Sequence, residues 1–179
     1  MAPILTPDEY RLWVILHQVY DLITRCKENV FAKTEITDQQ QQVLWLMELH
    51  NDVIGGPITI SDLAPILFRS MNSTSSIIDR MKKSGLIEKV RDLPDERAIR
   101  LIMTPKAKKI LKETSKTSDN LTKKLFSTFS EEEMIILFSL LKKLKTKARQ
   151  ELNLEESQTD PELYNSQNIT HFLTKLNQD

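Results

Sequence analysis

The sequence is short of glycine and cysteine and has no long apolar run, and each shortage removes a class of protein. The three glycines among 179 residues cannot form a glycine-rich loop that cradles a phosphate. The single cysteine, Cys26, cannot form an intramolecular disulfide, which is typical of a reducing cytoplasm. No apolar run approaches the roughly 18 residues that cross a bilayer, and no export signal is apparent. We therefore expect a cytoplasmic protein without a membrane segment.

Catalytic and metal-binding patterns are also missing. There is no nucleophile elbow, Walker motif, metal-binding helix pair or local Ser/His/Asp cluster, so we expect neither an enzyme nor a cofactor. His17 and Asp21 are four residues apart, but no third metal ligand is spaced to join them, and an Asp–His or Asp21–Arg25 surface pair is favoured. Cys26 could be a redox-active thiol, but its place on the apolar face of a helix favours a small core residue.

The middle of the chain contains a succession of local patterns. Ser61–Phe68 is a short segment with helical spacing of its apolar residues, and Asn72–Ser84 is a second one. Gly85 follows where a helix end needs a residue that tolerates positive φ. Leu86–Arg91 and Ala98–Met103 are rich in Ile, Val and Leu and flank a polar loop, which predicts a hairpin. Helix, turn, helix and hairpin in this order predict a winged helix-turn-helix.

The second helix of such a unit lies in the major groove of DNA and presents its first residues to base edges. Its inward face follows from spacings of three and four and consists of Thr74, Ile77, Ile78 and Met81. Beside that face are small polar residues that allow close approach to bases, namely Asn72, Ser73, Ser75 and Ser76. Between Arg69 and Lys109, eleven basic residues oppose five acidic ones, although the whole chain is neutral. This asymmetry is typical of a phosphate-binding face.

These residues carry a resemblance to a known family. The run S-T-S-S-I-I-D-R-M-K-K-S-G-L-I, then R-D-L-P-D-E-R, then L-I-M-T-P-K-A resembles the MarR family of winged helix-turn-helix transcriptional regulators. The departures are modest: Met71 and Ser76 stand where a basic residue is common, Met103 replaces a Leu, and Ala107 replaces a Gly. The resemblance is strong across this stretch and extends more weakly, by helix layout, to about Gln150.

The resemblance implies a function. Members of this family are dimeric regulators, so we expect a repressor that binds a pseudo-palindromic site on double-stranded DNA. It also implies release by a small aromatic or anionic effector bound between the dimerisation region and the lobe. The family places Arg97 at the wing tip in the minor groove, with Asp95 holding its guanidinium. The residues expected to bind phosphate or minor groove are Arg80, Lys83, Arg91 and Arg97. The competing interpretation is a winged-helix protein-interaction module without DNA binding, since Met71 and Ser76 lack the charge.

The remaining helices can be predicted from their first residues. Capping boxes begin at Thr6, Thr37 and Ser130, and Thr104-Pro105 pairs an N-cap residue with a proline at the first helical position. The first of these helices should run from Pro7 to about Phe31, which outreaches a single small core and suggests a dimer role. Ile58–Ile60 can add a third short strand to the hairpin.

The helix Met134–Gln150 is apolar nearly all round, so it needs partners on several sides, and a second subunit would supply them. We therefore expect a mainly α protein with a small β wing, built as a lobe plus a helical dimerisation region. The expected parts are an N-terminal dimerisation helix (1–36), the winged helix-turn-helix lobe (37–104), C-terminal dimerisation helices (105–150) and an acidic, partly helical extension (151–179).

The extension at 151–179 has six carboxylates against Lys175 alone. Asp160-Pro161 could begin a short helix, and an apolar stripe follows at Ile169, Phe172, Leu173 and Leu176. Two interpretations remain open: a partly helical segment that packs on the dimerisation region, and a disordered acidic tail.

Overall fold

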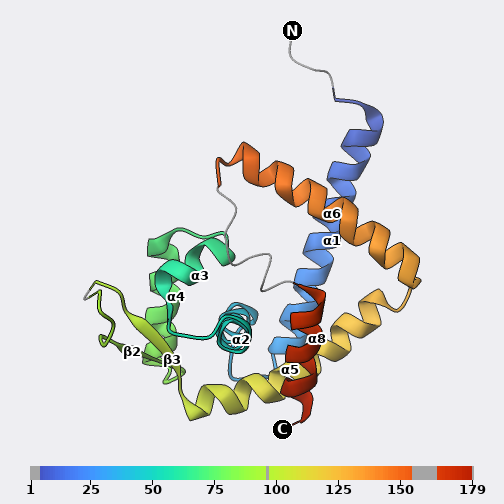
Figure 1. Cartoon of the computed structure of the whole chain (residues 1–179). Helices are drawn as coiled ribbons and strands as arrows, with labels where there is room; N and C mark the ends of the chain where they lie inside the picture. Colours follow the sequence, from blue (N-terminus) through green and yellow to red (C-terminus); the bar gives the residue numbers. More distant parts are fainter. Residues whose placement is uncertain (1–4, 96, 155–164, 179) are drawn as a thin grey trace.

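The computed structural model describes residues 5–95, 97–154 and 165–178, and it is mainly helical with one small sheet (Figure 1). Its elements in chain order are α1 (Pro7–Phe31), α2 (Asp38–Val53), β1 (Ile58–Thr59), α3 (Ile60–Ile66), α4 (Met71–Lys83), β2 (Ile87–Val90), β3 (Arg100–Met103), α5 (Pro105–Phe126), α6 (Glu131–Glu151) and α8 (Ser166–Gln178). The predicted fold class, a winged helix-turn-helix lobe with long additional helices, is confirmed.

The helix starts lie where the capping residues predict them. The side-chain oxygens of Thr6, Thr37 and Ser130 each accept a backbone N–H of the first turn. In return, the backbone N–H of each cap residue donates to the side chain three positions on, and Thr104 caps α5. The start of α3 differs from the expectation by one residue, since the sequence pattern places Ile60 in the strand and the following helix from Ser61. Thr59 and Asp62 form a further capping box, in which the Asp62 carboxylate accepts the Thr59 backbone N–H at 2.8 Å. The strand therefore ends at Thr59 and α3 begins at Ile60.

The sheet has the order β1-β3-β2 with antiparallel pairing throughout. Ile58 lies opposite Leu101, and Ile87 lies opposite Met103. Both wing strands are shorter than their apolar runs suggested, since the ladder between them ends at the Val90–Arg100 pair. Gly85, at φ +70°, allows the chain to leave α4 and enter β2 directly.

One apolar core holds the lobe together. It combines side chains of α2, α3, α4, the three strands and the beginning of α5. The predicted inward face of α4 is confirmed, because Ile77, Ile78 and Met81 are at most 3% exposed and Thr74 is fully buried. The core thus determines which side of α4 faces outward.

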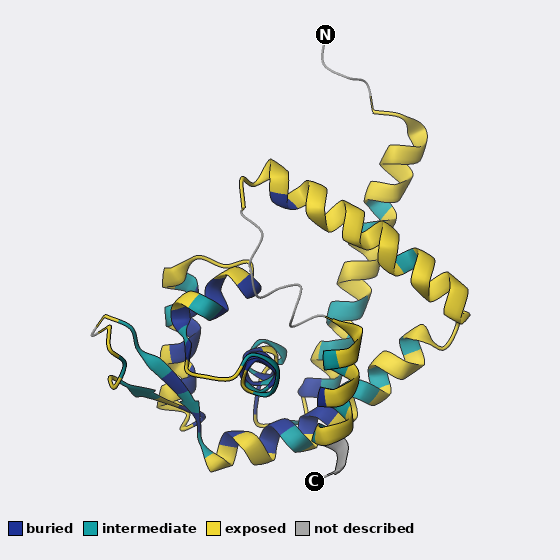
Figure 2. Cartoon of the chain, viewed as in Figure 1, coloured by how far each residue is buried: buried dark blue, intermediate teal, exposed yellow. Residues whose placement is uncertain are grey.

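The long helices outside the lobe keep their apolar faces uncovered. Figure 2 shows α6 exposed along nearly its whole length and α1 exposed mainly over its first half, and the only residue of α6 that is buried is Arg149. On α6, Ile135 is 70% exposed and Phe138 is 65% exposed. On α1, Leu12 and Trp13 are more than half exposed. None of the described helices combines the length and the apolar character needed to cross a membrane.

The C-terminal helix α8 lies against α2 and α5 (Figure 1). Phe172 on its apolar stripe is 1% exposed and belongs to the lobe core, and Ile169, Leu173 and Leu176 pack beside it. We expected this segment to pack on the dimerisation region, but its contacts are with the lobe helix α2 as well as with α5. The predicted helix start at Asp160-Pro161 lies outside the described residues.

Candidate nucleic-acid interface

The first two turns of α4 present small polar side chains to the surface. Ser70 caps the helix by accepting the Ser73 backbone N–H at 3.2 Å. Asn72 and Ser76 are exposed, and the Ser76 hydroxyl donates to the Asn72 carbonyl at 3.0 Å. Ser73 and Ser75 are half-buried. We call these four residues, Asn72, Ser73, Ser75 and Ser76, the polar ridge. Asn72 and Ser76 are its most exposed members.

The second half of α4 is basic. Arg80 and Lys83 are both exposed. The Arg80 guanidinium donates to the side-chain oxygen of Gln39 on α2 at 3.4 Å, a long contact that leaves its charge available. Lys83 has no ion-pair partner within the described part of the chain. Positive charge therefore follows the polar ridge along the same helix.

An ion pair ties α4 to the wing. The Lys89 ammonium of β2 donates to the Asp79 carboxylate of α4 at 2.6 Å, and the lysine side chain is only 14% exposed. This hydrogen bond holds the pKa of Asp79 below its ordinary value. From the sequence, Lys89 contributes only to the positive charge of this stretch. Its ion pair with Asp79 could not be predicted, because the pairing depends on the turn at Gly85.

A second carboxylate closes the wing at its base. The Asp92 carboxylate accepts two hydrogen bonds from the Arg100 guanidinium, with Nε at 2.9 Å from Oδ1 and Nη2 on Oδ2. The pair lowers the pKa of Asp92 and raises that of Arg100. The loop between these two residues is therefore anchored at both ends.

The wing tip differs from expectation in one contact. Asp95 accepts a hydrogen bond from the backbone N–H of Arg97 at 2.9 Å, whereas we expected it to hold the guanidinium. An aspartate commonly bonds the backbone two residues ahead in a turn, so it shapes the loop instead of the side chain. The exposed Arg97 guanidinium has no carboxylate partner among the described residues, and Arg91 is exposed as well.

The turn between α3 and α4 is held by a residue that the sequence did not single out. Phe68 adopts a left-handed conformation, with φ 52°. Its ring lies 5.4 Å from the Lys145 ammonium and 5.3 Å from the Arg149 guanidinium, both at the end of α6. These cation–π contacts connect α6 to the helix-turn-helix.

Other candidate sites find little support in the described residues. Nowhere in residues 5–95, 97–154 and 165–178 do three His, Cys, Asp or Glu side chains gather as a metal site would require. Neither of the two expected surface pairs, His17–Asp21 or Asp21–Arg25, forms among the described residues. The His17 Nδ1 instead bonds the Trp13 carbonyl one helical turn back, at 2.8 Å. Cys26 is a free thiol of intermediate exposure.

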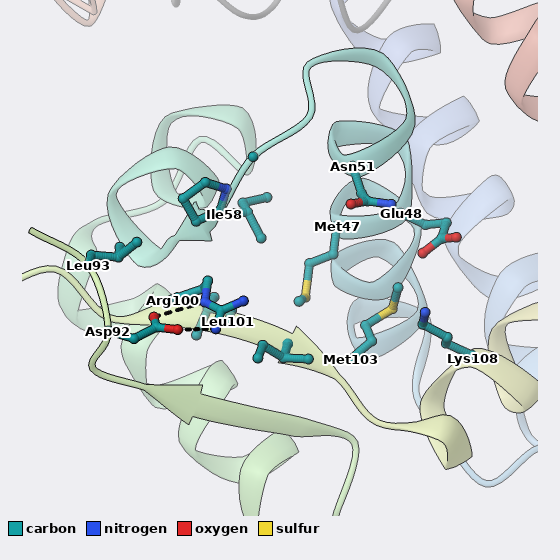
Figure 3. Close-up of a pocket in the computed structure, with 13 residues that line it drawn as sticks. Met47, Glu48, Asn51, Ile58, Asp92, Leu93, Arg100, Leu101, Met103 and Lys108 are labelled. Atoms are coloured by element: carbon teal, nitrogen blue, oxygen red, sulfur yellow. Dashed lines mark hydrogen bonds and ion pairs between the residues drawn. The ribbon is translucent and has the colours of Figure 1, made fainter.

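A cavity of about 580 Å³ lies at the base of the wing (Figure 3). Its floor is formed by the largely buried Met47, Ile58, Leu101 and Met103, and polar groups make up much of the remaining lining. The Asp92–Arg100 pair lies at one end, and Glu48, Asn51 and Lys108 lie at the other. The cavity thus joins α2, the wing and the first turn of α5.

Comparison with known proteins identifies relatives of this chain. The sequence model described as the MarR family matches residues 39–99. The uncharacterized HTH-type transcriptional regulator YsmB of Bacillus subtilis is 30% identical over 131 residues, which cover 73% of this chain and 86% of that protein.

Solved structures share the fold. The organohalide-sensing regulator RdhR-CbdbA1625, in its 2,4-dichlorophenol-bound form, is 27% identical with a TM-score of 0.68, covering 79% of this chain and 82% of that one. The MepR protein of S. aureus, in a complex with DNA, is 21% identical with a TM-score of 0.70, covering 75% of this chain and 96% of that one.

The two ion pairs of the wing predict that its stability falls in acid. Because each carboxyl has a lowered pKa in the fold, its stabilising effect is complete at neutral pH. That effect is lost as the pH falls through the lowered value. In an NMR titration, Lys89→Met should raise the pKa of Asp79 towards its ordinary value and leave Asp92 unchanged. Arg100→Met should do the reverse. A shift of both carboxyls in either variant would contradict the assignment of two separate ties.

Proposed function

This chain belongs to the MarR family of transcriptional regulators, and from that premise we propose that it is a repressor that binds double-stranded DNA through α4 and the wing. The observation that carries the proposal is the outward side of α4, which combines a small polar ridge with exposed Arg80 and Lys83. The Asp79–Lys89 ion pair keeps the wing beside this helix, so that both can meet one duplex. We further propose a cytoplasmic location, where such a regulator meets DNA, and no enzymatic activity.

Base edges would be contacted by Asn72, Ser73, Ser75 and Ser76 in the major groove. Asn72 and Ser76 are the exposed members and would reach furthest, with the amide suited to an adenine edge. The half-buried Ser73 and Ser75 would contact bases only where the backbone of α4 comes closer to the DNA. Phosphates and the minor groove would be contacted by Arg80, Lys83, Arg91 and Arg97, while Asp95 keeps the wing tip in shape.

Replacing Arg97 tests the wing. Arg97→Ala removes an exposed charge from the proposed interface, so affinity for the chain's own upstream DNA should fall. If Arg97 neutralises one phosphate, the slope of log affinity against log salt should flatten by about 0.9. The measurement is a mobility-shift or anisotropy titration at two or more salt concentrations.

The matched control is Lys124→Ala, which removes one exposed charge near the far end of α5. This variant should bind DNA as the unaltered protein does. Unchanged affinity of Arg97→Ala would mean that the wing does not contact DNA. If neither the unaltered protein nor the variants bind the DNA specifically, the competing function is favoured, namely a winged-helix module for protein contacts.

We propose that the protein acts as a homodimer. The exposed apolar faces of α1 and α6 support this, because an isolated subunit would leave Leu12, Trp13, Ile136 and Phe138 in water. A twofold arrangement would place two α4 helices in successive major grooves about 34 Å apart, which requires a pseudo-palindromic operator.

A charge on α6 should separate the subunits. Ile136 is 58% exposed in the single chain, so Ile136→Asp should fold normally and shift the protein from dimer to monomer in light scattering after gel filtration. Lys143→Asp, an exposed charge change on the same helix, is the control for surface charge alone. A dimer that withstands Ile136→Asp would place the interface elsewhere.

We propose that an effector acts through the cavity at the base of the wing. The supporting observation is its position, since a ligand on the apolar floor would contact β3 and could move the wing relative to α2. The cationic Lys108 at one end suits an anionic head group, in keeping with the expected small aromatic or anionic effector.

Benzoate-type anions and chlorophenols are suitable probes for this cavity. A probe that binds there should raise the melting temperature of the protein and weaken its DNA binding. Met47→Trp should fill the floor and abolish both effects, whereas Lys124→Ala should retain them. Equal responses in Met47→Trp and the unaltered protein would place the effector site outside this cavity.

A further inference from the structure

The C-terminal helix α8 fills a groove that the lobe helices form. The groove is defined by the contacts of α8 with α2 and α5 (Figure 1), and the apolar stripe of α8 packs on the lobe core through Phe172, Ile169, Leu173 and Leu176. The sequence model of the family stops at residue 99, so this helix lies beyond the part that the model describes.

One aromatic contact anchors the helix. Phe172 is 1% exposed, and its ring meets the ring of Trp45 on α2 edge to face, at 5.3 Å between centroids and 87° between planes. Such a pair adds directional attraction to the burial of the ring. The neighbouring Ile169, Leu173 and Leu176 are only partly buried. Phe172 is therefore the most deeply buried contact of α8 with the lobe.

A charged contact fixes the direction of the helix. Asp52, at the end of α2, has a side chain only 6% exposed, and its Oδ1 accepts a hydrogen bond from the Lys175 ammonium of α8. The Nε2 atom of His171 lies 3.9 Å from Oδ2, an atom that accepts no hydrogen bond from the described residues. Among the described residues, the charged partners of this carboxylate both come from α8, so the docked helix both covers and pairs it.

The helix does not have the means to be stable by itself. It spans 13 residues, and isolated helices shorter than about 12–15 residues are marginal in water. Its fit is also incomplete, because a cavity of about 170 Å³ remains between Leu111 and Lys112 of α5 and Phe172 and Leu176 of α8. A short helix with one deep anchor and imperfect packing is suited to dock and to leave.

We propose that α8 is a detachable intramolecular strap: the α2–α5 groove is a binding site for an amphipathic helix, and its occupant is the chain's own residues 166–178. In the docked state the strap holds α2 and α5 together and so restrains the core that orients α4. Release would loosen α2, and DNA binding would then have to order it again, which weakens affinity. Only this last step rests on the proposed function.

The first experiment asks whether the groove accepts the helix from outside. A fluorescently labelled peptide of residues 166–178 is titrated into the full-length Phe172→Asp variant and into the unaltered protein. The peptide should bind the variant at least tenfold more tightly, because the unaltered groove is already occupied. A peptide that itself carries Phe172→Asp should not bind. Thr174→Ala, on the exposed side of α8, is the matched control protein and should behave as the unaltered one. Binding of the peptide to neither protein would overturn the proposal.

Hydrogen exchange provides a second measurement that does not depend on the peptide. In the unaltered protein the α8 amides should exchange at least tenfold more slowly than in an unfolded chain. In Phe172→Asp this protection should be lost, while the sheet and α4 keep theirs. Exchange of α8 at the unfolded rate in the unaltered protein would overturn the proposal.

A charge exchange tests the specific contact without removing the aromatic anchor. Asp52→Lys should release α8, since it would face Lys175 and His171, and the added change Lys175→Asp should restore docking. Failure of the second change to restore exchange protection would overturn the assigned contact.

DNA affinity completes the test. Phe172→Asp should bind the operator several-fold more weakly than the unaltered protein, and unlabelled peptide should restore its affinity. If the peptide binds but DNA affinity does not change, the coupling to α4 is wrong. If even the unaltered protein fails to bind DNA, the proposed function fails, while the peptide and exchange results still decide the strap.

Discussion

Burial of one side of α4 is the constraint on which the rest of the lobe depends. Thr74, Ile77, Ile78 and Met81 pack into the core that α2, α3 and the sheet share. Because a helix repeats every 3.6 residues, burying these four forces the small polar residues of the first two turns to the outer surface. The Asp79–Lys89 ion pair then fixes the wing beside that surface. The polar ridge, the basic half of the helix and the wing therefore form one continuous face.

The same apolar force has two different outcomes in this chain. In the lobe it closes a core that determines which side of α4 is exposed. In α1 and α6 it leaves broad apolar faces that no described part of the chain covers. The polar and basic side of α4 and the exposed apolar faces of α1 and α6 therefore lie on different elements.

Segments from the second half of the chain return to the lobe at two places. The end of α6 contacts Phe68 in the turn of the helix-turn-helix, through Lys145 and Arg149. The helix α8 contacts α2, at Trp45 and Asp52. Both contacts lie outside the reading surface, yet both act on elements that support α4. The lobe is therefore mechanically connected to parts of the chain that follow it in sequence.

The features that could be predicted from the sequence are those that depend on near neighbours. Helix caps at Thr6, Thr37, Thr104 and Ser130, the turn at Gly85 and the inward face of α4 involve residues at most four positions apart, so their patterns are legible in one dimension. Tertiary packing selected the Asp79–Lys89 and Asp92–Arg100 pairs and the docking of α8 on α2. The Asp95–Arg97 contact is local, but the sequence is compatible with a bond from either the backbone or the guanidinium of Arg97. Charged side chains have many possible partners along a chain, and the choice among them is made by the packing that brings distant segments together.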